Sequence, residues 1–450
     1  MITRRQFIKQ AGMTGAGLLL TASLPGRLTA AFSKTVICIG AGLAGLAAAY
    51  KLKQAGYKVI VLESRNRVGG RVFSHPVTDS LVIELGGEWV GNSHSRMQEL
   101  CNGFDLELLN NQLDTHLIYK GNYSPAGKWE YSESWKKKWN ELIAGYGHLS
   151  DADKQQLDQY DWWRYLVNNG CQERDLEIRE LLDSTDFGES IRHVSAFAAL
   201  AEYAESSEKN EMDLKIKGGN QMLAKKLADA IGRENILLQH TVTRIDQKEK
   251  VTVFCGNGKT FSANKIICSI PTFALSKIQW LPELPPEKTG AINELQYARI
   301  NKHAVVFKER FWKEEAFDLI SDETPQYFYH ATKGQPGTEG VLISYTIGDK
   351  AAVMANGTNA ANASAIIQTL APCFGDIQPL IRQQVNYYWG TDAISQGAYA
   401  LFGINQWFRL RPALAEPFLH THFAGEHLAD WQGFMEGAVN TGEEAAQQII

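Results

Sequence analysis

The stretch TVICIGAGLAGLAAAYKLKQ, residues 35–54, decides the fold of this chain of 450 residues. A β-branched, apolar run leads directly into Gly40, Gly42 and Gly45, and a run rich in alanine and leucine follows. Ala and Leu are among the best helix formers, whereas β-branched residues favour strands. A second apolar run, 58–62, ends at Glu63. This order of strand, glycine turn, helix, strand and acid predicts a Rossmann-type, dinucleotide-binding α/β fold.

Each residue of the glycine turn has a physical role in such a fold. Gly40 permits the tight turn, Gly42 lets the backbone approach a pyrophosphate, and Gly45 lets the helix pack closely on the strand. The free N–H groups and the partial positive charge of the helix N-terminus suit the phosphates. Glu63 is placed to accept hydrogen bonds from a ribose. The turn by itself could hold either NAD or FAD.

Composition excludes several classes of protein. Hydrophobic residues make up 44% and charged residues 21%, which is typical of a folded chain of about two to three domains. The formal net charge is -5 and no block of like charges occurs, so we expect no nucleic-acid partner. The six cysteines form no CxxC pair, and we predict no metal site.

The first residues have the pattern of an export signal. Arg4 and Arg5 precede a small-residue apolar stretch, 11–24, and a run that ends at Ala31. A basic head, an apolar middle and a small-residue exit are typical of secretory signals, and paired arginines indicate the twin-arginine route. We therefore predict a signal peptide over 1–31 and a periplasmic protein. The apolar stretch is too short and glycine-rich for a stable membrane span, and a short membrane-associated helix is the alternative.

The segment after Glu63 distinguishes the two cofactors. The sequence RNRVGGR, residues 65–71, follows the acid almost immediately. In this respect the chain resembles the flavin amine oxidase family, in which such a segment wraps the pyrophosphate and ribityl chain of FAD. Glycines bring the backbone close to phosphate, and arginine supplies a fixed fork of donors. The resemblance therefore implies an FAD-dependent oxidoreductase.

The resemblance extends over most of the chain after the predicted signal. The segment ELGGEWVG, 84–91, is similar to the glycine-rich segment beside the isoalloxazine, and FAGEH, 423–427, with GFMEGAV, 433–439, is similar to the C-terminal flavin segment. The cofactor-binding residues that the resemblance implies are Gly40, Gly42, Ala44, Gly45, Glu63, Ser64, Arg65, Gly70, Arg71, Gly87, Glu88, Trp89, Val242, Gly425, Glu426, Gly433, Phe434 and Met435.

The resemblance also implies the domain organisation. A glutathione-reductase-like FAD domain would be assembled from 33–100, 215–296 and 390–450. The remainder would form an α+β substrate domain, with helices in 101–214 and a mixed or antiparallel sheet in 297–389. Aromatic and charged residues at helical spacing support the helical part, and strand-like runs at 301–307, 341–346 and 383–389 support the sheet.

Four residues match catalytic positions of the family. Lys302 matches the lysine that holds a water against flavin N5, while Tyr399 and Phe434 match the two walls of an aromatic cage around the substrate amine. Trp389 begins a further segment near the flavin. Mammalian mitochondrial monoamine oxidases carry a cysteine bonded to FAD where this chain has Ala398, so non-covalent FAD is implied. The residues expected to line the substrate pocket are Trp89, Trp431 and Tyr399.

The reaction that the resemblance implies is oxidation of a primary or secondary amine. Hydride would pass from the amine Cα to flavin N5, and water would hydrolyse the imine to an aldehyde or ketone and to ammonia or a smaller amine. Oxygen would then be reduced to H2O2. The expected partners are a small amine and O2, and the oligomeric state is open, a homodimer included.

Three other functions compete with this interpretation. An L-amino acid oxidase would need a cation for the substrate carboxylate, a role that Arg96 or Arg299 could fill. A flavin amine dehydrogenase would pass electrons to a periplasmic carrier instead of oxygen. A non-catalytic FAD-binding protein would have no need of Lys302 and Tyr399, and both are present.

Overall fold

The predicted strand–turn–helix unit is part of a five-stranded parallel sheet. The computed structural model describes residues 34–205, 213–248, 250–430 and 432–450, so the predicted signal peptide, 1–31, lies outside the described residues. The strand order is β22 (Thr421–Phe423), β13 (Lys265–Cys268), β1 (Thr35–Ile39), β2 (Lys58–Leu62) and β9 (Ile236–Leu237). Because β1 and β13 are almost wholly apolar and buried, the sheet needs cover on both faces.

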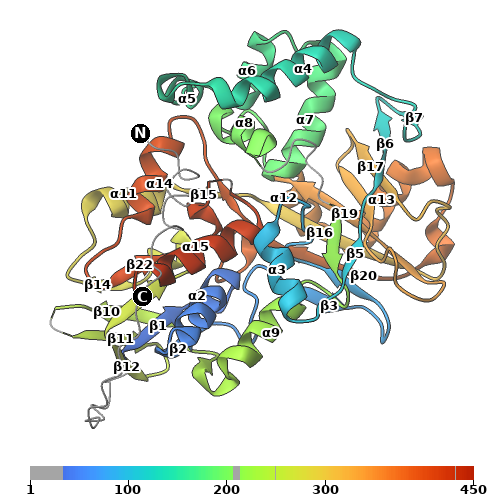
Figure 1. The fold of residues 1–450 in the computed structure, drawn as a ribbon. Coiled ribbons are helices and arrows are strands. Elements are labelled where there is room, and N and C mark those ends of the chain that lie inside the picture. The colour runs from blue at the N-terminus through green and yellow to red at the C-terminus, as the bar shows by residue number, and fades with distance from the viewer. Residues whose placement is uncertain (1–33, 206–212, 249, 431) are drawn as a thin grey trace, which may run out of the picture. The chain divides into compact units, whose positions relative to one another are not determined.

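Helices from both ends of the chain cover this sheet. Helix α2 (Leu43–Gln54) connects β1 to β2 and packs against α15 (Met435–Gln447) and α9 (Gln221–Ile231). Figure 1 shows blue α2 side by side with red α15, so the first and last helices of the described chain are neighbours. A smaller sheet of β12 (Thr260–Ala263), β11 (Val251–Cys255), β10 (Val242–Asp246) and β14 (Gln279–Leu281) completes the dinucleotide-binding part.

A second large sheet has seven strands and is mixed. Its order is β20 (Ile381–Tyr388), β16 (Ile300–Phe307), β19 (Gly340–Ile347), β18 (Tyr327–His330), β17 (Phe317–Ser321), β6 (Asp114–Tyr119) and β7 (Asn122–Ser124). All neighbours are antiparallel except β17 and β6. Every residue of β16 and of β19 is buried, so polar side chains on these strands are removed from bulk water.

The helical part of the substrate region is shorter than predicted. The helical cluster comprises α4 (Glu133–Gly145), α5 (Asp151–Leu157), α6 (Trp162–Asn168), α7 (Glu173–Phe187) and α8 (Ala196–Glu205). Residues 108–124, which the sequence assigned to the helical segment, instead form strands, of which β6 and β7 extend the seven-stranded sheet. Because β6 pairs with β17 about two hundred residues later, its own short sequence gives little indication of this.

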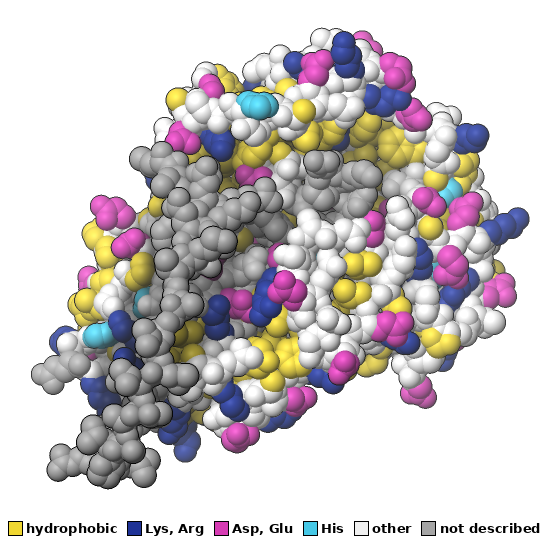
Figure 2. Space-filling view, in the orientation of Figure 1, with side chains coloured by type: hydrophobic (Ala, Val, Ile, Leu, Met, Phe, Trp, Pro, Cys, Tyr) yellow, Lys and Arg dark blue, Asp and Glu magenta, His cyan; other side chains and the backbone are white. Residues whose placement is uncertain are grey.

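The helical cluster has one solvent-facing side and one apolar side. In Figure 2 hydrophobic side chains gather along its lower edge, where it meets the rest of the molecule. The elements that connect the larger parts are β3 (Ser74–Pro76), β4 (Val82–Glu84), α3 (Ser95–Gly103), β5 (Leu108–Asn110), β8 (Leu214–Ile216), α10 (Thr272–Leu275), α11 (Pro286–Glu294), β15 (Gln296–Tyr297), α12 (Gly348–Asn356), α13 (Asn359–Phe374), β21 (Ala400–Leu401) and α14 (Trp407–Ala415).

Membrane-spanning helices and metal-binding clusters are both absent from the described residues. No described helix is long and apolar enough to cross a membrane. Within the same residues, no group of three or more His, Cys, Asp or Glu side chains is arranged to hold a metal ion. All six cysteines are described, and each has a free thiol.

Candidate active site

One cavity of about 650 Å³ brings the predicted site residues together. It is lined by segments of the glycine turn, of 63–72, of 86–89 and of the C-terminal region, and also by residues of the seven-stranded sheet and the helical cluster. All the predicted site residues that the structure describes line this cavity, with one exception. The exception is Gly45, which does not line the cavity. A Cβ added at Gly45 would lie 2.0 Å from the Gly40 carbonyl oxygen, so this glycine allows the helix to pack closely on the turn.

The glycine turn leads into a helix whose first N–H groups have no side-chain cap. Two backbone hydrogen bonds hold the turn itself: the Gly40 N–H donates to the Leu62 carbonyl over 2.8 Å, and the Gly69 N–H donates to the Ala41 carbonyl over 2.8 Å. Helix α2 begins at Leu43 with Gly42 as its N-cap, which has no side chain to bond the first-turn N–H groups. The N–H groups of the first turn of α2 are therefore available to an anion.

Glu63 lies buried between the glycine turn and the segment that follows it. Its Oε2 accepts from the Ala41 N–H over 2.7 Å, and its Oε1 accepts from the Arg65 N–H over 2.8 Å. Burial raises the pKa of Glu63, although both backbone hydrogen bonds act in the opposite direction. A carboxylate has about four acceptor positions, so both oxygens keep capacity for the hydroxyls of a ribose.

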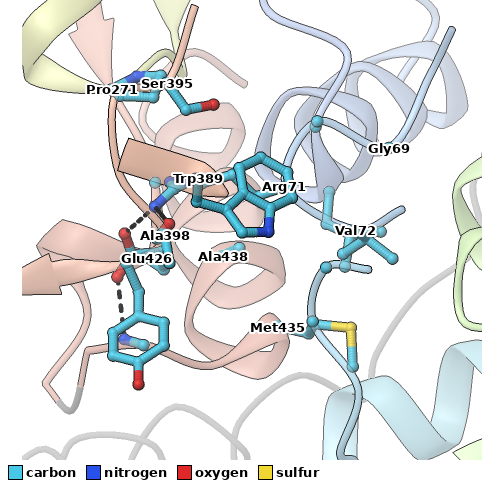
Figure 3. A pocket seen from close by; sticks show the side chains of 18 of the residues that line it. Gly69, Arg71, Val72, Pro271, Trp389, Ser395, Ala398, Glu426, Met435 and Ala438 are labelled. Atoms are coloured by element: carbon cyan, nitrogen blue, oxygen red, sulfur yellow. Dashed lines mark hydrogen bonds and ion pairs between the residues drawn. The ribbon is translucent and has the colours of Figure 1, made fainter. Parts of the chain in front are cut away.

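The side chains of Arg65 and Arg71 bind carboxylates from the C-terminal part of the chain. Arg65 donates to both oxygens of Asp392 over 2.9 and 2.7 Å, and Arg71 donates to Glu426 over 2.5 Å and to the Ala398 carbonyl over 2.7 Å. Figure 3 shows Arg71 and Glu426 meeting across the cavity wall. Burial acts to raise the pKa of Asp392, but the Arg65 guanidinium holds it well below its usual range. Both arginines line the cavity, and their contact with FAD stays a prediction.

Glu426 organises the C-terminal segment. Besides Arg71, it accepts hydrogen bonds from the Ala400 N–H over 3.1 Å and from the Gly433 N–H over 2.9 Å. Helix α15 then begins at Met435, with Phe434 as an N-cap that provides no side-chain hydrogen bond. The N-termini of α2 and α15 thus open onto the same cavity, and two such partial positive charges suit a dianionic pyrophosphate and an electron-rich flavin ring.

Lys302 is a buried ammonium on a fully buried strand. Its Nζ donates to the carbonyls of Glu84 and Gly86 over 3.0 and 2.8 Å and to Oε2 of Glu88 over 3.0 Å. The Tyr329 hydroxyl donates to the same Glu88 oxygen. An ammonium has three N–H donors, and each of them meets an acceptor here. Lys302 therefore fixes the backbone of the segment 84–88 and the carboxylate of Glu88. This role was not predicted from the sequence, which indicated only contact with a water molecule.

Trp389 supports the same segment from another strand end. Its indole Nε1 donates to the Leu85 carbonyl over 2.7 Å, and the side chain is buried. Trp89 packs against Tyr329 with ring centroids 5.1 Å apart. The residues between 84 and 89 are consequently held by hydrogen bonds and aromatic contacts before any ligand arrives, which is the preorganisation that a cofactor site requires.

The two predicted cage residues come from different segments. The Tyr399 hydroxyl donates to the Asp186 carbonyl over 2.7 Å and lies 3.2 Å from the Tyr345 hydroxyl. Phe434 packs edge-to-face with His94 at a centroid distance of 5.3 Å. A Cβ on Gly433 would come within 3.5 Å of the Tyr399 ring, so Tyr399 and the start of α15 are neighbours. Trp431, predicted for the same pocket, lies outside the described residues.

The cavity also holds polar side chains that the sequence did not identify. Four such carboxyl groups line it away from the glycine turn: Asp186 on α7, Glu202 on α8, Asp213 just before β8 and Asp318 on β17. Burial raises the pKa of Asp318 to about 7, because only the Tyr327 and Thr115 hydroxyls oppose it. One signal could have indicated Glu202, since it is an acid within the apolar run AFAALAEYA, 196–204.

Comparisons with known proteins agree with this arrangement. A family model described as flavin containing amine oxidoreductase matches residues 43–450. Flavin-containing amine oxidase B of Homo sapiens is 26% identical over 468 aligned residues, covering 92% of this chain and 86% of the human protein. A probable flavin-containing monoamine oxidase A of Dictyostelium discoideum is 25% identical, with 92% of this chain and 97% of that protein covered.

Solved structures share the fold. A putrescine oxidase bound to putrescine superposes with a TM-score of 0.81 at 23% identity, covering 92% of this chain and 98% of that one. Cyclohexylamine oxidase from Brevibacterium oxydans superposes with a TM-score of 0.82 at 24% identity, covering 93% and 98%. The α/β architecture, with a parallel dinucleotide-binding sheet and a mixed second sheet, is thus confirmed as that of FAD-dependent amine oxidases.

Proposed function

Because the chain belongs to the family of flavin-containing amine oxidoreductases, we propose that it binds FAD without a covalent bond and oxidises a primary or secondary amine. One observation carries the proposal. The uncapped N-termini of α2 and α15, the buried Lys302 and the aromatic Tyr399 all meet at a single cavity. A dinucleotide, a redox ring and an amine can then lie in one continuous space.

The residues of the chain orient the reactants and exclude water. A bound flavin would supply the redox chemistry, which is acceptance of a hydride from the carbon that bears the amine and reduction of O2 to H2O2. Lys302 holds the backbone of 84–88 in place and keeps a positive charge beside the cavity. Tyr399 and Phe434 both line the cavity, and in the proposed reaction their aromatic rings would flank a neutral amine. Fixing the amine in a reactive pose is the main contribution expected of the protein.

Non-covalent binding is supported by the residues around the cavity. Ala398, at the position of the flavin-linked cysteine in mitochondrial monoamine oxidases, lines the cavity and has no nucleophile. None of the six cysteines, all of them described, lines the cavity. Treating the purified yellow protein with acid or detergent should therefore release all of its flavin into solution. Flavin that stays with the precipitated protein would refute this part of the proposal.

An amine is a better substrate for this site than an amino acid. Arg96 forms ion pairs with Glu99 and Glu443, Arg299 forms ion pairs with Glu189 and Asp349, and neither arginine lines the cavity. Among the described residues that line the cavity, the arginines and Lys302 are already paired with carboxylates. Lys277 lies next to α10 on the dinucleotide side. An α-carboxylate would instead meet the carboxyl groups of the substrate side.

A substrate panel tests the proposed reaction. The holoenzyme is mixed without oxygen with an amine or with the amino acid that bears the same side chain, and loss of flavin absorbance is recorded. Amines should reduce the flavin and amino acids should not. In air, each turnover of an oxidase should yield one equivalent of H2O2, whereas a dehydrogenase would yield little unless an electron carrier is added. Reduction by amino acids alone would overturn the proposed substrate class.

We propose further that the protein is exported to the periplasm by the twin-arginine route. The support is the sequence pattern of residues 1–31. This route carries folded proteins, which suits an enzyme that must acquire its flavin before export. Replacing Arg4 and Arg5 together by lysine should leave the yellow enzyme in the cytoplasm, as fractionation would show. Unchanged export of the double variant would contradict the route.

A further inference from the structure

The carboxyl group of Glu202 is buried without a partner. Glu202 is 5% exposed and lines the cavity from α8, a helix whose residues 196–203 are all buried. No hydrogen bond or ion pair joins its carboxylate to any residue that the structure describes. Burial disfavours the ionised form of such a carboxyl group, so a cationic ligand that enters the cavity would be stabilised beside it.

The surroundings of Glu202 are acidic. Asp183 is neutralised by Arg179, with 3.1 Å between Nη2 and Oδ2. Asp186 accepts only a neutral hydrogen bond, from the Tyr203 hydroxyl over 2.7 Å, and its side chain is accessible within the cavity. Burial and the charges of Asp186 and Asp183 hold the pKa of Glu202 well above its usual range. Among the residues that the structure describes, no lysine or arginine forms an ion pair with the carboxyl group of Asp186 or of Glu202.

Glu202 and Asp186 form an acidic site near Tyr399, one of the two aromatic residues expected to flank the amine. The Tyr399 hydroxyl donates to the backbone of Asp186, and the charge of Glu202 acts on that same hydroxyl. The other end of Tyr399 lies beside Gly433, at the start of α15. An amine beside Tyr399 and Phe434 would thus lie in the same cavity as Glu202 and Asp186, which lie toward the hydroxyl end of Tyr399.

We propose that Glu202, assisted by Asp186, binds a second cationic group of the substrate, and that the natural substrate is a short aliphatic diamine or a related amine with two charges. The proposal rests on the proposed amine oxidation and deepens it. A distal ammonium would favour the ionised form of Glu202, whose proton is released to solvent, and would donate a charge-assisted hydrogen bond to it. The reacting amino group, next to aromatic faces, can bind neutral while the distal group stays charged.

The test compares putrescine with n-butylamine, which has the same carbon chain but only one amino group. In the wild-type holoenzyme kcat/KM for putrescine should exceed that for n-butylamine by about tenfold or more, the effect of one charge-assisted hydrogen bond. In Glu202→Gln this ratio should fall by about tenfold, mainly through a higher KM for putrescine, while the values for n-butylamine change little. Asp186→Asn, which keeps an acceptor for Tyr203, should lower the ratio in the same direction.

Asp158→Asn is the matched control, because Asp158 is also a buried acid of the helical cluster but does not line the cavity. It lies at the end of α5, and its Oδ1 accepts from the Ser195 hydroxyl over 2.5 Å. The putrescine to n-butylamine ratio should stay within about threefold of wild type. A ratio that collapses in Asp158→Asn but not in Glu202→Gln would overturn the assignment to Glu202.

Thermal stability separates ligand binding from a purely structural role. Replacing an unpaired buried carboxylate by a neutral amide should leave the melting temperature of the substrate-free holoenzyme unchanged or raise it. A lower melting temperature with both amines affected equally would show a structural role and refute the proposal, as would an unchanged ratio. If n-butylamine reduces the flavin but putrescine has no advantage, only this inference fails. If neither amine reduces it, the proposed function itself fails.

Discussion

Replacing Gly42 by alanine should weaken flavin binding while leaving the fold intact. Gly42 has φ -73° and ψ 176°, which alanine adopts without strain. A Cβ at this position would have as its nearest atom the Cα of Gly70, at 4.0 Å, so it enters open space. Because Gly42 lines the cavity at the N-terminus of α2, that space is where the pyrophosphate is expected.

The magnitudes of the two effects differ strongly. The substitution should change the stability of the apo-protein by no more than about 1 kcal/mol, the size of ordinary N-cap and Gly-to-Ala effects. The added methyl should cost at least one charge-assisted hydrogen bond between a backbone N–H and a phosphate oxygen, about 1.5–3 kcal/mol. The dissociation constant for FAD should therefore rise by roughly tenfold to a hundredfold.

Gly45→Ala is the matched comparison three residues later. A Cβ there would lie 2.0 Å from the Gly40 carbonyl oxygen and 2.6 Å from Oγ of Ser269, so the backbone has to move. Overpacking of this kind costs about 3 kcal/mol or more, which lowers the melting temperature of the apo-protein by roughly 5 °C. The two variants should thus fail differently, Gly42→Ala in cofactor binding and Gly45→Ala first in stability.

Two measurements check this reasoning. Fluorescence titration of apo-protein with FAD gives the dissociation constant, and thermal unfolding of the apo-proteins at one scan rate gives the melting temperatures. A Gly42→Ala protein that binds FAD with wild-type affinity would refute the placement of the pyrophosphate. A Gly42→Ala apo-protein that melts several degrees lower would refute the argument that the methyl group enters open space.

Three further predictions concern buried charges and the cofactor. Lys302→Met should destabilise the protein by about 3–5 kcal/mol, because buried Glu88 would lose its cation. Combining Lys302→Met with Glu88→Gln should recover part of the lost melting temperature, and no recovery would contradict the pairing. Burial raises the pKa of the Asp318 carboxyl from 3.8 in the unfolded chain to about 7 in the folded protein. Its protonated form therefore stabilises the fold at low pH, and this contribution, up to about 4 kcal/mol, is lost as the pH rises from about 4 to about 7. Asp318→Asn should therefore gain melting temperature relative to wild type as pH increases over that window, and a constant difference between the two proteins would refute the raised pKa. Arg65→Glu should lower the flavin content per protein after gel filtration, because Asp392 and Ser395 would lose the hydrogen-bond donor that they share. Arg96→Glu should not lower the flavin content, because Arg96 lies outside the cavity.

Much of the fold follows from local sequence pattern. The glycine spacing after β1, the helix formers of α2 and the acid after β2 lie within thirty residues, so their meaning does not depend on distant parts of the chain. The strands around Lys302 were predictable for a similar reason, since their apolar runs exceed what a surface strand carries. Strand β6 was missed, because a short run of six residues becomes a strand only when β17 pairs with it.

The sequence by itself determined the dinucleotide-binding unit, and through resemblance it predicted a flavin and catalytic roles for Lys302, Tyr399 and Phe434. Only the tertiary structure decided which charges are satisfied. It pairs Arg65 with Asp392 and Lys302 with Glu88, residues far apart in the chain, and among the described residues it gives Glu202 no cation as a partner. The physical reason is that a glycine turn works through the backbone of neighbouring residues, whereas a buried charge depends on whatever the fold brings within a few ångströms of it.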